Sequence, residues 1–291
     1  MLVSQVKMEG FVMSKMRFWG TSAGEGVPTP FCRCEICENA RKRGGKDLRT
    51  RSCFRLDDEV MIDVGADFIP QSHRLGEDTF DVEHIVYSHT HDDHFNPKVW
   101  WFRSVSPVRK GDKLNVYLSE YGVKALEKLV QGNETYLDTV KIHTLKFYET
   151  YDIDKYKFTP LKGHHHTGFE ANSANYLIDF PDGRKMYYAL DSGPYLEETY
   201  EYLKNVKLDI LISECTFPVE NMGIDVHMGL TEARENLDRL YAQGTIDENT
   251  KVYMTHICCM GMNHNELVEY WKNTAPQYNI TVAYDGLSME G

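Results

Sequence analysis

His89-Thr-His-Asp-Asp-His94 is the stretch that decides the fold, because it places four side chains of metal-binding type within six positions. It directly follows Glu83-His-Ile-Val-Tyr-Ser88, whose β-branched and aromatic residues predict a buried strand. The four candidate ligands would therefore lie on a loop at the edge of a sheet. Alternation directs the first two histidines to one side, and the Asp-Asp step directs Asp93 and His94 to a second point nearby. This density of imidazoles and carboxylates indicates a site for zinc, manganese or iron.

The composition excludes several classes of protein. The chain has 291 residues, 42% of them apolar, and a net charge of −12. An acidic protein repels phosphates, which disfavours nucleic acid and anionic membranes as general partners but leaves room for one small phosphorylated substrate at a local site. There is no apolar run of about 18 residues, so we expect no membrane span. Residues 1–14 lack the features of an export signal, and we expect a cytoplasmic protein.

Strand patterns outnumber helix patterns along the chain, and helices interleave in both halves. This order predicts two β-sheets packed together with helices on their outer faces, a four-layer αββα sandwich. We expect one domain over residues 14–291, preceded by a disordered extension at residues 1–13. Residues of metal-binding type recur at the ends of the predicted strands, which is the placement that one site at one edge of the sandwich requires. They are the 89–94 stretch, His164–His166, Asp191 and His256.

The cysteines point to a second metal site. Three of the seven lie in Cys32-Arg-Cys-Glu-Ile-Cys37, and the absence of an export signal favours metal ligation over disulfides. A catalytic thiol is the alternative. Cys53 and Cys215 lie in strand-like runs and are most simply small core residues. The basic stretch from Arg41 to Arg51 is interpreted as a solvated helix end and loop, with a substrate-facing patch as the other interpretation.

The residues at the ends of the predicted strands resemble those of the metallo-β-lactamase fold hydrolases, in identity and in order along the chain. The order is Asp63, the 89–94 stretch, His164–His166, Asp191 and His256. The resemblance covers nearly the whole chain, from Met16 to about Gly286. Within that superfamily the chain is most similar to the branch containing the phosphonate-pathway phosphodiesterase that opens a ribose cyclic phosphate. The similarity lies in residues 20–28 followed by C-x-C-x-x-C, in Thr255-His-Ile257, and in His227 ahead of a Leu-Thr helix start.

The resemblance implies two divalent ions in the active site, zinc or manganese, with iron as a third option. The implied ligands are His89, His91 and His165 for one ion, and Asp93, His94 and His256 for the other, with Asp191 bridging. His165 follows from the spacing of the branch, and His164 is the runner-up. A hydroxide shared by two ions would form near neutral pH, because metal binding lowers the pKa of water from 15.7 to about 7. Asp63 is interpreted as a group that orients a liganding histidine or as a turn cap.

The branch also carries a structural zinc. It is held by the three cysteines and by a residue three positions after the last active-site histidine. That residue is Cys259 here, where the branch leads us to expect histidine, and the resulting set is Cys32, Cys34, Cys37 and Cys259. The adjacent Cys258 could replace Cys259 as a ligand.

The candidate catalytic residues are His227 and Asp93. In the branch the histidine that matches His227 lies over the metals, where it donates a proton to the leaving group or binds a phosphate oxygen. The other interpretation of His227 is a surface residue before a helix that begins near Thr231.

The resemblance implies a metal-dependent hydrolase, a phosphodiesterase for a small and perhaps cyclic phosphodiester. The first alternative is a tRNA-processing nuclease, but such enzymes carry a long insertion where only 26 positions separate His165 from Asp191 here. The second alternative is a non-hydrolytic protein of cofactor biosynthesis, which bound iron without phosphodiesterase activity would favour. Oligomeric state stays open, with a homodimer among the options.

Overall fold

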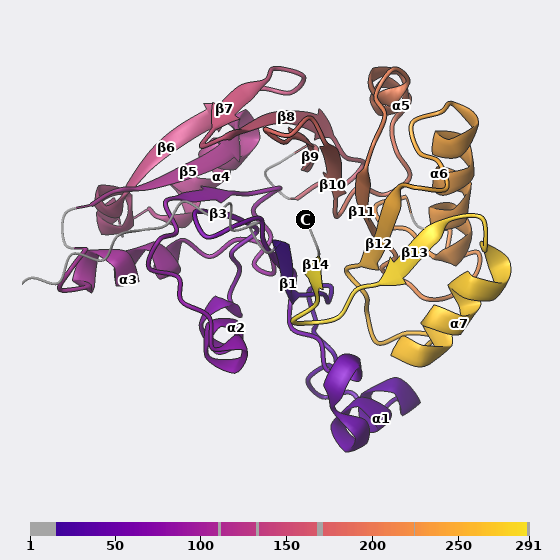
Figure 1. Cartoon of the computed structure of the whole chain (residues 1–291). Coiled ribbons are helices and arrows are strands. Elements are labelled where there is room, and N and C mark those ends of the chain that lie inside the picture. The colour runs from indigo at the N-terminus through magenta and orange to yellow at the C-terminus, as the bar shows by residue number, and fades with distance from the viewer. Residues whose placement is uncertain (1–15, 110–111, 132–133, 168–170, 224, 290–291) are drawn as a thin grey trace, which may run out of the picture.

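Two seven-stranded β-sheets pack face to face, and Figure 1 shows helices on the outer side of each. The computed structural model describes residues 16–109, 112–131, 134–167, 171–223 and 225–289. This arrangement confirms the predicted αββα sandwich. The extension predicted at residues 1–13 lies outside the described residues.

The first sheet has the order β14-β1-β2-β3-β4-β5-β6. Its strands are β1 (Met16–Gly20), β2 (Cys53–Arg55), β3 (Val60–Ile62), β4 (His84–Val86), β5 (Leu114–Ser119), β6 (Val140–Leu145) and β14 (Ser288–Met289). Strands β3 to β6 are parallel, whereas β14, β1, β2 and β3 pair antiparallel with one another in turn.

The second sheet has the order β13-β12-β11-β10-β9-β8-β7. Its strands are β7 (Tyr151–Ile153), β8 (Tyr156–Lys162), β9 (Ala174–Asp179), β10 (Lys185–Ala189), β11 (Ile210–Glu214), β12 (Lys251–Thr255) and β13 (Asn279–Val282). Strands β10 to β13 are parallel. Because β8 and β10 are both antiparallel to β9, β8 runs in the same direction as β10. The carboxyl ends of β8, β10, β11 and β12 therefore lie at one edge of this sheet.

Seven α-helices accompany the sheets in the described part of the chain, and several of them begin at residues whose side chains cap them. They are α1 (Glu35–Arg43), α2 (Phe68–Leu75), α3 (Trp100–Val105), α4 (Glu120–Leu129), α5 (Glu197–Leu203), α6 (Leu230–Ala242) and α7 (His264–Thr274), with 3-10 turns at Gly45–Asp47, Pro97–Val99 and Glu134–Thr139. Asn263 accepts hydrogen bonds from the first turn of α7, and Glu266 accepts one from the Asn263 backbone in return. Ser119 caps α4 through the backbone N–H of Gly122. Such caps satisfy backbone donors that the first turn leaves unpaired.

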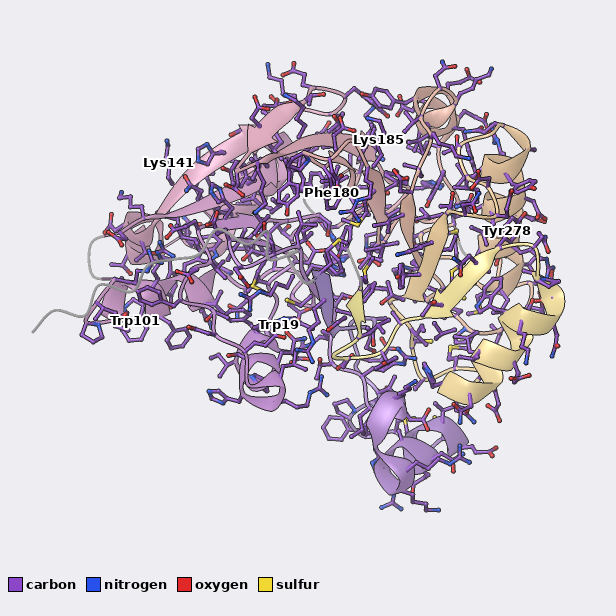
Figure 2. All side chains as sticks on the ribbon, viewed as in Figure 1. Trp19, Trp101, Lys141, Phe180, Lys185 and Tyr278 are labelled. Atoms are coloured by element: carbon purple, nitrogen blue, oxygen red, sulfur yellow. The ribbon has the colours of Figure 1, made fainter. Side chains whose placement is uncertain are left out.

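Three apolar clusters hold the four layers together. The cluster between the sheets includes Phe18, Phe158 and Tyr176. The Tyr176 hydroxyl donates to the carbonyl of Tyr87, 2.7 Å away, and so ties the second sheet to the first. Figure 2 shows side chains filling the space between the sheets, where Phe180 lies. The other two clusters join each sheet to its own helices, and full burial of each large apolar side chain contributes roughly 1.5–3 kcal/mol.

No helix in the described part of the chain is long and apolar enough to cross a membrane. Helix α1 lies at the end of the molecule that is lowest in Figure 1, next to the cysteine-bearing loop. The loops that follow the strands of both sheets are left to form a site at the edge of the sandwich.

Candidate metal centre

Every predicted ligand of the main site lies just after a strand. Three strand-end residues, Asp63, Asp191 and His256, have φ values of 58°, 47° and 58°. This left-handed region is strained for residues other than glycine and is least costly for Asn, Asp and His. The positive φ turns the chain sharply at each strand end, where Asp191 and His256 join a ligand group and Asp63 contacts His94.

One group of candidate ligands contains three histidines. The ring nitrogens of His89, His91 and His165 all lie within 4.8 Å of one another. His91 Nδ1 is 3.0 Å from His89 Nε2 and 3.0 Å from His165 Nε2. His165 therefore joins the group that the 89–94 stretch begins, whereas His164 and His166 belong to none of the candidate groups among the described residues.

The second group contains Asp93, His94, Asp191 and His256, all buried. His94 Nε2 lies 3.2 Å from His256 Nε2 and 2.8 Å from Asp191 Oδ2. Asp191 Oδ2 is also 3.2 Å from His89 Nε2 in the first group. Asp191 is thus the residue that lies between the two groups.

In His94, His165 and His256, the ring nitrogen that points away from the groups has a partner of its own. His94 Nδ1 bonds to Asp63 Oδ2 at 2.9 Å, and His165 Nδ1 donates to the Val226 carbonyl at 3.1 Å. His256 Nδ1 lies 2.9 Å from the Thr216 hydroxyl. Partners of this kind fix the tautomer and ring orientation of metal-binding histidines. The contact of Asp63 with His94 is the one that its interpretation as an orienting group requires.

The site combines neutral histidines with carboxylates that attract positive charge. Burial lowers the pKa of His89 well below its usual range, and it also lowers the pKa of His91 and of His165, which keeps these rings neutral. Burial alone would lower the pKa of His94 too, but the carboxylates of Asp93 and Asp191 raise it well above the usual range. These carboxylates therefore hold a positive charge at the second group.

The residues present fit two divalent ions. Zinc binds nitrogen at about 2.0–2.1 Å, so nitrogens 3.0–3.2 Å apart are close enough to share one ion. Asp191 Oδ1 is buried and makes no hydrogen bond of normal geometry among the described residues, although His227 Nδ1 lies 3.1 Å away and His256 Nε2 lies 3.2 Å away. An orphaned buried carboxylate oxygen is costly unless a cation or a donor meets it. A cation between the two groups would satisfy it.

Glu214, the last residue of β11, is the largest contribution that the sequence analysis missed. Its side chain is fully buried. Oε1 accepts hydrogen bonds from the backbone N–H groups of Ser192 and Gly193, at 2.7 and 2.8 Å. Oε2 accepts from Thr216 Oγ1 and from the backbone N–H of Met228, at 2.5 and 3.2 Å. Glu214 thus fixes the segments that carry Asp191 and His227, and it also holds Thr216, whose hydroxyl bonds to His256. The signal was available, because a carboxylate ends the apolar strand at 210–214.

His227 reaches the same site from the loop before α6. Its Nδ1 bonds to Glu214 Oε2 at 3.1 Å and lies 3.1 Å from Asp191 Oδ1. Burial alone would lower the pKa of His227, but Glu214 and Asp191 raise it to about 11. Because Nδ1 is held by Glu214, Nε2 is the nitrogen left to act on a substrate. Asp191, Glu214, His227 and His256 also form a candidate ligand group, but both oxygens of Glu214 already accept several hydrogen bonds.

A cavity of about 300 Å³ opens over these groups. It is lined by Ala23, Gly24, Glu25, His91, Asp92, Asp93, His165, Asp191, Thr216, Phe217, His227 and His256. Phe217 packs edge-on against His227, with ring centroids 5.9 Å apart. The volume suits a small ligand rather than a polymer.

The predicted cysteine set also comes together. The sulfurs of Cys32, Cys34, Cys37 and Cys259 lie within 4.8 Å of one another, and Cys258 is not part of the group. Backbone N–H groups approach these sulfurs; for example, the N–H of Thr29 lies 3.3 Å from Cys37 Sγ. Four cysteines arranged in this way suit a closed tetrahedral zinc site.

We expect Cys259→Ser to lower the zinc content by about one ion per chain, because a hydroxyl is a poorer zinc ligand than a thiolate. Loss of the zinc that would cross-link residues 32–37 to the loop after β12 should lower the thermal midpoint of unfolding by about 5–10 °C. Elemental analysis and calorimetry measure both quantities. Cys258→Ala is the matched control and should keep the zinc. Wild-type zinc content in Cys259→Ser would contradict the assignment.

Comparison with known proteins adds the following. The sequence-family model described as the beta-lactamase superfamily domain matches residues 58–257 of the chain. A diphosphatase from the PhnP family has 23% sequence identity and a TM-score of 0.72, over 96% of this chain and 98% of that one. Zinc-bound PqqB from Methylobacterium extorquens has 17% identity and a TM-score of 0.69, over 95% and 100%. The short form of human tRNase Z has 17% identity and a TM-score of 0.64, over 95% and 98%. No curated protein sequence matches the chain. At these identities the structural likeness establishes the fold alone.

Proposed function

The chain belongs to the β-lactamase superfamily, with the metallo-β-lactamase fold, and from this membership we propose that it is a metal-dependent phosphodiesterase for a small, perhaps cyclic, phosphodiester. The observation that carries the proposal is the position of Asp191 between two ligand groups, with His227 beside it. The small volume of the cavity supports a small substrate.

The two ligand groups would hold two divalent ions, zinc or manganese in our proposal. When bound, such ions would stabilise the charge of a reacting phosphate and lower the pKa of a bound water to about 7. His89, His91 and His165 would hold one ion, and Asp93, His94 and His256 the other, with Asp191 shared. The closed cysteine set would hold a structural zinc.

The chain's own residues then have distinct tasks. His227 Nε2 carries a proton that it gives to the leaving-group oxygen, because Glu214 holds the opposite nitrogen of the ring. Glu214 keeps the imidazole at a fixed orientation and stabilises its protonated form. Phe217 and Gly24 bound the cavity on the substrate side. Phe217 supplies an apolar wall and excludes water from one side.

The test is hydrolysis of bis-p-nitrophenyl phosphate and of cyclic nucleotides by protein loaded with zinc, manganese or cobalt. We expect turnover with at least one of these metals. Its absence with all three would contradict the proposal. Precursor tRNA serves as the comparison substrate, and its cleavage would favour a nuclease instead. Iron in the purified protein, together with no diester hydrolysis, would favour a non-hydrolytic role.

We expect His227→Ala to lower kcat by about 100-fold, the usual contribution of one proton donor. Metal content should remain at the wild-type value, because the seven proposed active-site ligands are intact. Steady-state kinetics and elemental analysis measure the two quantities on the same preparation. Unchanged turnover at unchanged metal content would show that His227 is not the proton donor.

A further inference from the structure

His256 is the last residue of the second ligand group, and its backbone is strained. Its φ of 58° lies in the left-handed region, which a residue other than glycine keeps only where the surrounding structure holds it there. Strand β12 ends at Thr255, so the regular ladder of the sheet stops one residue before the ligand. The hydrogen bonds around His256 must therefore fix the position of its ring.

The loop after β11 supplies part of this support. The N–H of Cys258 donates to the Thr216 carbonyl at 2.9 Å, and the Thr216 hydroxyl lies 2.9 Å from His256 Nδ1. These bonds hold the ring itself and the second residue after it. The peptide of Ile257, directly after the ligand, has its partners on a different segment.

That segment is residues 21–22, near the start of the described chain. The N–H of Ile257 donates to the Thr21 carbonyl at 2.9 Å, and the Ser22 hydroxyl donates to the Ile257 carbonyl at 2.9 Å. The two backbones run parallel here, with Ser22 beside Ile257. Ser22 is fully buried and Ile257 is 3% exposed, so water does not compete for the bond. A buried side-chain hydrogen bond thus holds the peptide that follows a proposed metal ligand.

Ser22 is itself fixed to the first sheet. Its N–H donates to the Thr50 carbonyl at 2.8 Å. Its own carbonyl accepts from the Ser52 N–H at 3.0 Å and from the Ser52 hydroxyl at 2.9 Å, and the Ser52 segment leads directly into β2. Ser22 therefore ties the loop of His256, which follows a strand of the second sheet, to the sheet that supplies His94.

The second ligand group tolerates little movement of His256. Its Nε2 lies 3.2 Å from His94 Nε2 and 3.2 Å from Asp191 Oδ1. It also lies 3.6 Å from Asp93 Oδ2. Distances from a bound metal to its ligands vary by only about 0.2 Å between good sites. A larger shift of the peptide after His256 would carry the ring out of the group.

The segment that contains Ser22 continues into the metal centre. Ala23 and Gly24 follow it and line the cavity over the ligand groups. A Cβ at position 24 would lie 3.4 Å from the Asp93 carboxylate, so the loop backbone packs against another ligand of the second group. Ser22 thus lies where this loop leaves the core and approaches two of the ligands.

We propose that Ser22 is a positioning residue for the second ligand group. Its hydroxyl holds the Ile257 carbonyl and so keeps His256 in the strained conformation that binding of the second ion requires. The inference rests on the proposed function as far as the metal centre, and it does not depend on the substrate. Outer partners that orient metal ligands contribute about 10- to 100-fold to metal affinity, and Ser22 acts in this way through the backbone.

The experiment measures metal affinity directly. Manganese titration followed by electron paramagnetic resonance reports the active-site ions in protein that keeps zinc at its cysteines, because thiolates select zinc whereas carboxylates and imidazoles accept manganese. We expect two manganese ions per chain. His165→Ala and His256→Ala identify which affinity belongs to which ligand group. Ser22→Ala should weaken the second ion about 10- to 100-fold and the first ion less than about threefold.

Ser52→Ala is the matched control. It removes a buried hydroxyl bond of the same length from the same residue, but on the side of the first sheet. Both substitutions should lower the thermal midpoint of the manganese-free protein by similar amounts. Only Ser22→Ala should weaken the second ion, so a general loss of order cannot produce the expected result. Equal affinity for the second ion in wild type and Ser22→Ala would overturn the inference.

A double-mutant cycle tests whether Ser22 acts through His256. In the His256→Ala background, Ser22→Ala should change the remaining affinity of the second group less than about twofold, because the ring that Ser22 positions is absent. A full further loss of affinity in that background would show that Ser22 acts by another route and would overturn the positioning role.

Metal binding without turnover separates this inference from the proposed function. A selective effect of Ser22→Ala on the second ion supports the positioning role even if no diester is hydrolysed. If diesters are hydrolysed, excess manganese should restore the rate of Ser22→Ala to within about threefold of wild type, because the substitution weakens the binding of an ion and leaves the reacting groups in place. Wild-type protein that bound fewer than two manganese ions would contradict the metal centre and this inference together.

Discussion

Replacing Asp191 with asparagine should lower diester hydrolysis by at least about 1,000-fold, which corresponds to roughly 4 kcal/mol of transition-state stabilisation. Bound active-site metal should fall below one ion per chain. Asp191 is the residue whose oxygens face both ligand groups. Oδ2 lies 3.2 Å from His89 Nε2 and 2.8 Å from His94 Nε2, and Oδ1 lies 3.2 Å from His256 Nε2.

The asparagine substitution changes charge and donor pattern but hardly changes shape. One oxygen becomes an NH₂ group, which cannot bind a cation. The substitution also removes the negative charge that would neutralise part of the charge of the two cations. Burial alone would raise the pKa of Asp191, but His256 and His94 hold it well below its usual range, so the wild-type group is ionised. Asp179→Asn, at a half-exposed ion pair with Lys185, is the control and should change the rate less than twofold. An Asp191→Asn protein that kept both ions and a tenth of the activity would refute the bridging role.

Glu214→Gln should lower kcat by about 100-fold, or roughly 2.7 kcal/mol, although Glu214 belongs to neither of the two proposed ligand groups. Burial alone would raise the pKa of Glu214, but His227 lowers it to about 2, so glutamine also removes a negative charge. The new NH₂ group must face either the N–H groups of Ser192 and Gly193 or the donors of Thr216 and Met228. Either orientation places a donor against donors. His227 loses its acceptor in the second orientation, and in both orientations it loses the negative charge that stabilises its protonated form.

Stability measurements separate the role of Glu214 in the fold from its role in the site. Removing one partner from a buried charge network costs about 3–5 kcal/mol, so the free energy of unfolding should fall by that order. Glu232→Gln is the matched control, because Glu232 accepts from the N–H of Gly229 in the same loop at the start of α6. It should lower stability by about 1 kcal/mol and leave kcat unchanged. Wild-type kcat in Glu214→Gln would refute the positioning role.

The succession of strands along the chain and the four layers were predictable because the apolar runs are well separated by turns, whereas the order of the strands within each sheet was not predicted. Helix α2 was not predicted, and α1 was predicted only as a helix end in the basic stretch, for identifiable reasons. In α1 the sulfur of Cys34 accepts from the Cys37 N–H and caps the helix, a role that cysteine spacing does not suggest. In α2, Pro70 lies in the first turn, where no N–H is needed, so proline does not break the helix.

The candidate ligands could be named from the sequence because each is a polar residue directly after an apolar run. The choice of His165 within His164–His166 required the resemblance, since alternation alone left two options. Thr216 was beyond reach, because its task depends on the hydrogen bond it shares with His256 across two strands.

Each ligand group takes side chains from both sheets, so the geometry of the metal centre depends on the alignment of the two sheets. His91 follows a strand of the first sheet, and His165 follows a strand of the second, yet their nitrogens meet at 3.0 Å. A slide of one sheet over the other by a fraction of an ångström would open both groups at once. Tyr176→Phe removes the hydrogen bond to the Tyr87 carbonyl in the core between the sheets. We therefore expect substitutions of this kind to weaken metal affinity before they unfold the domain.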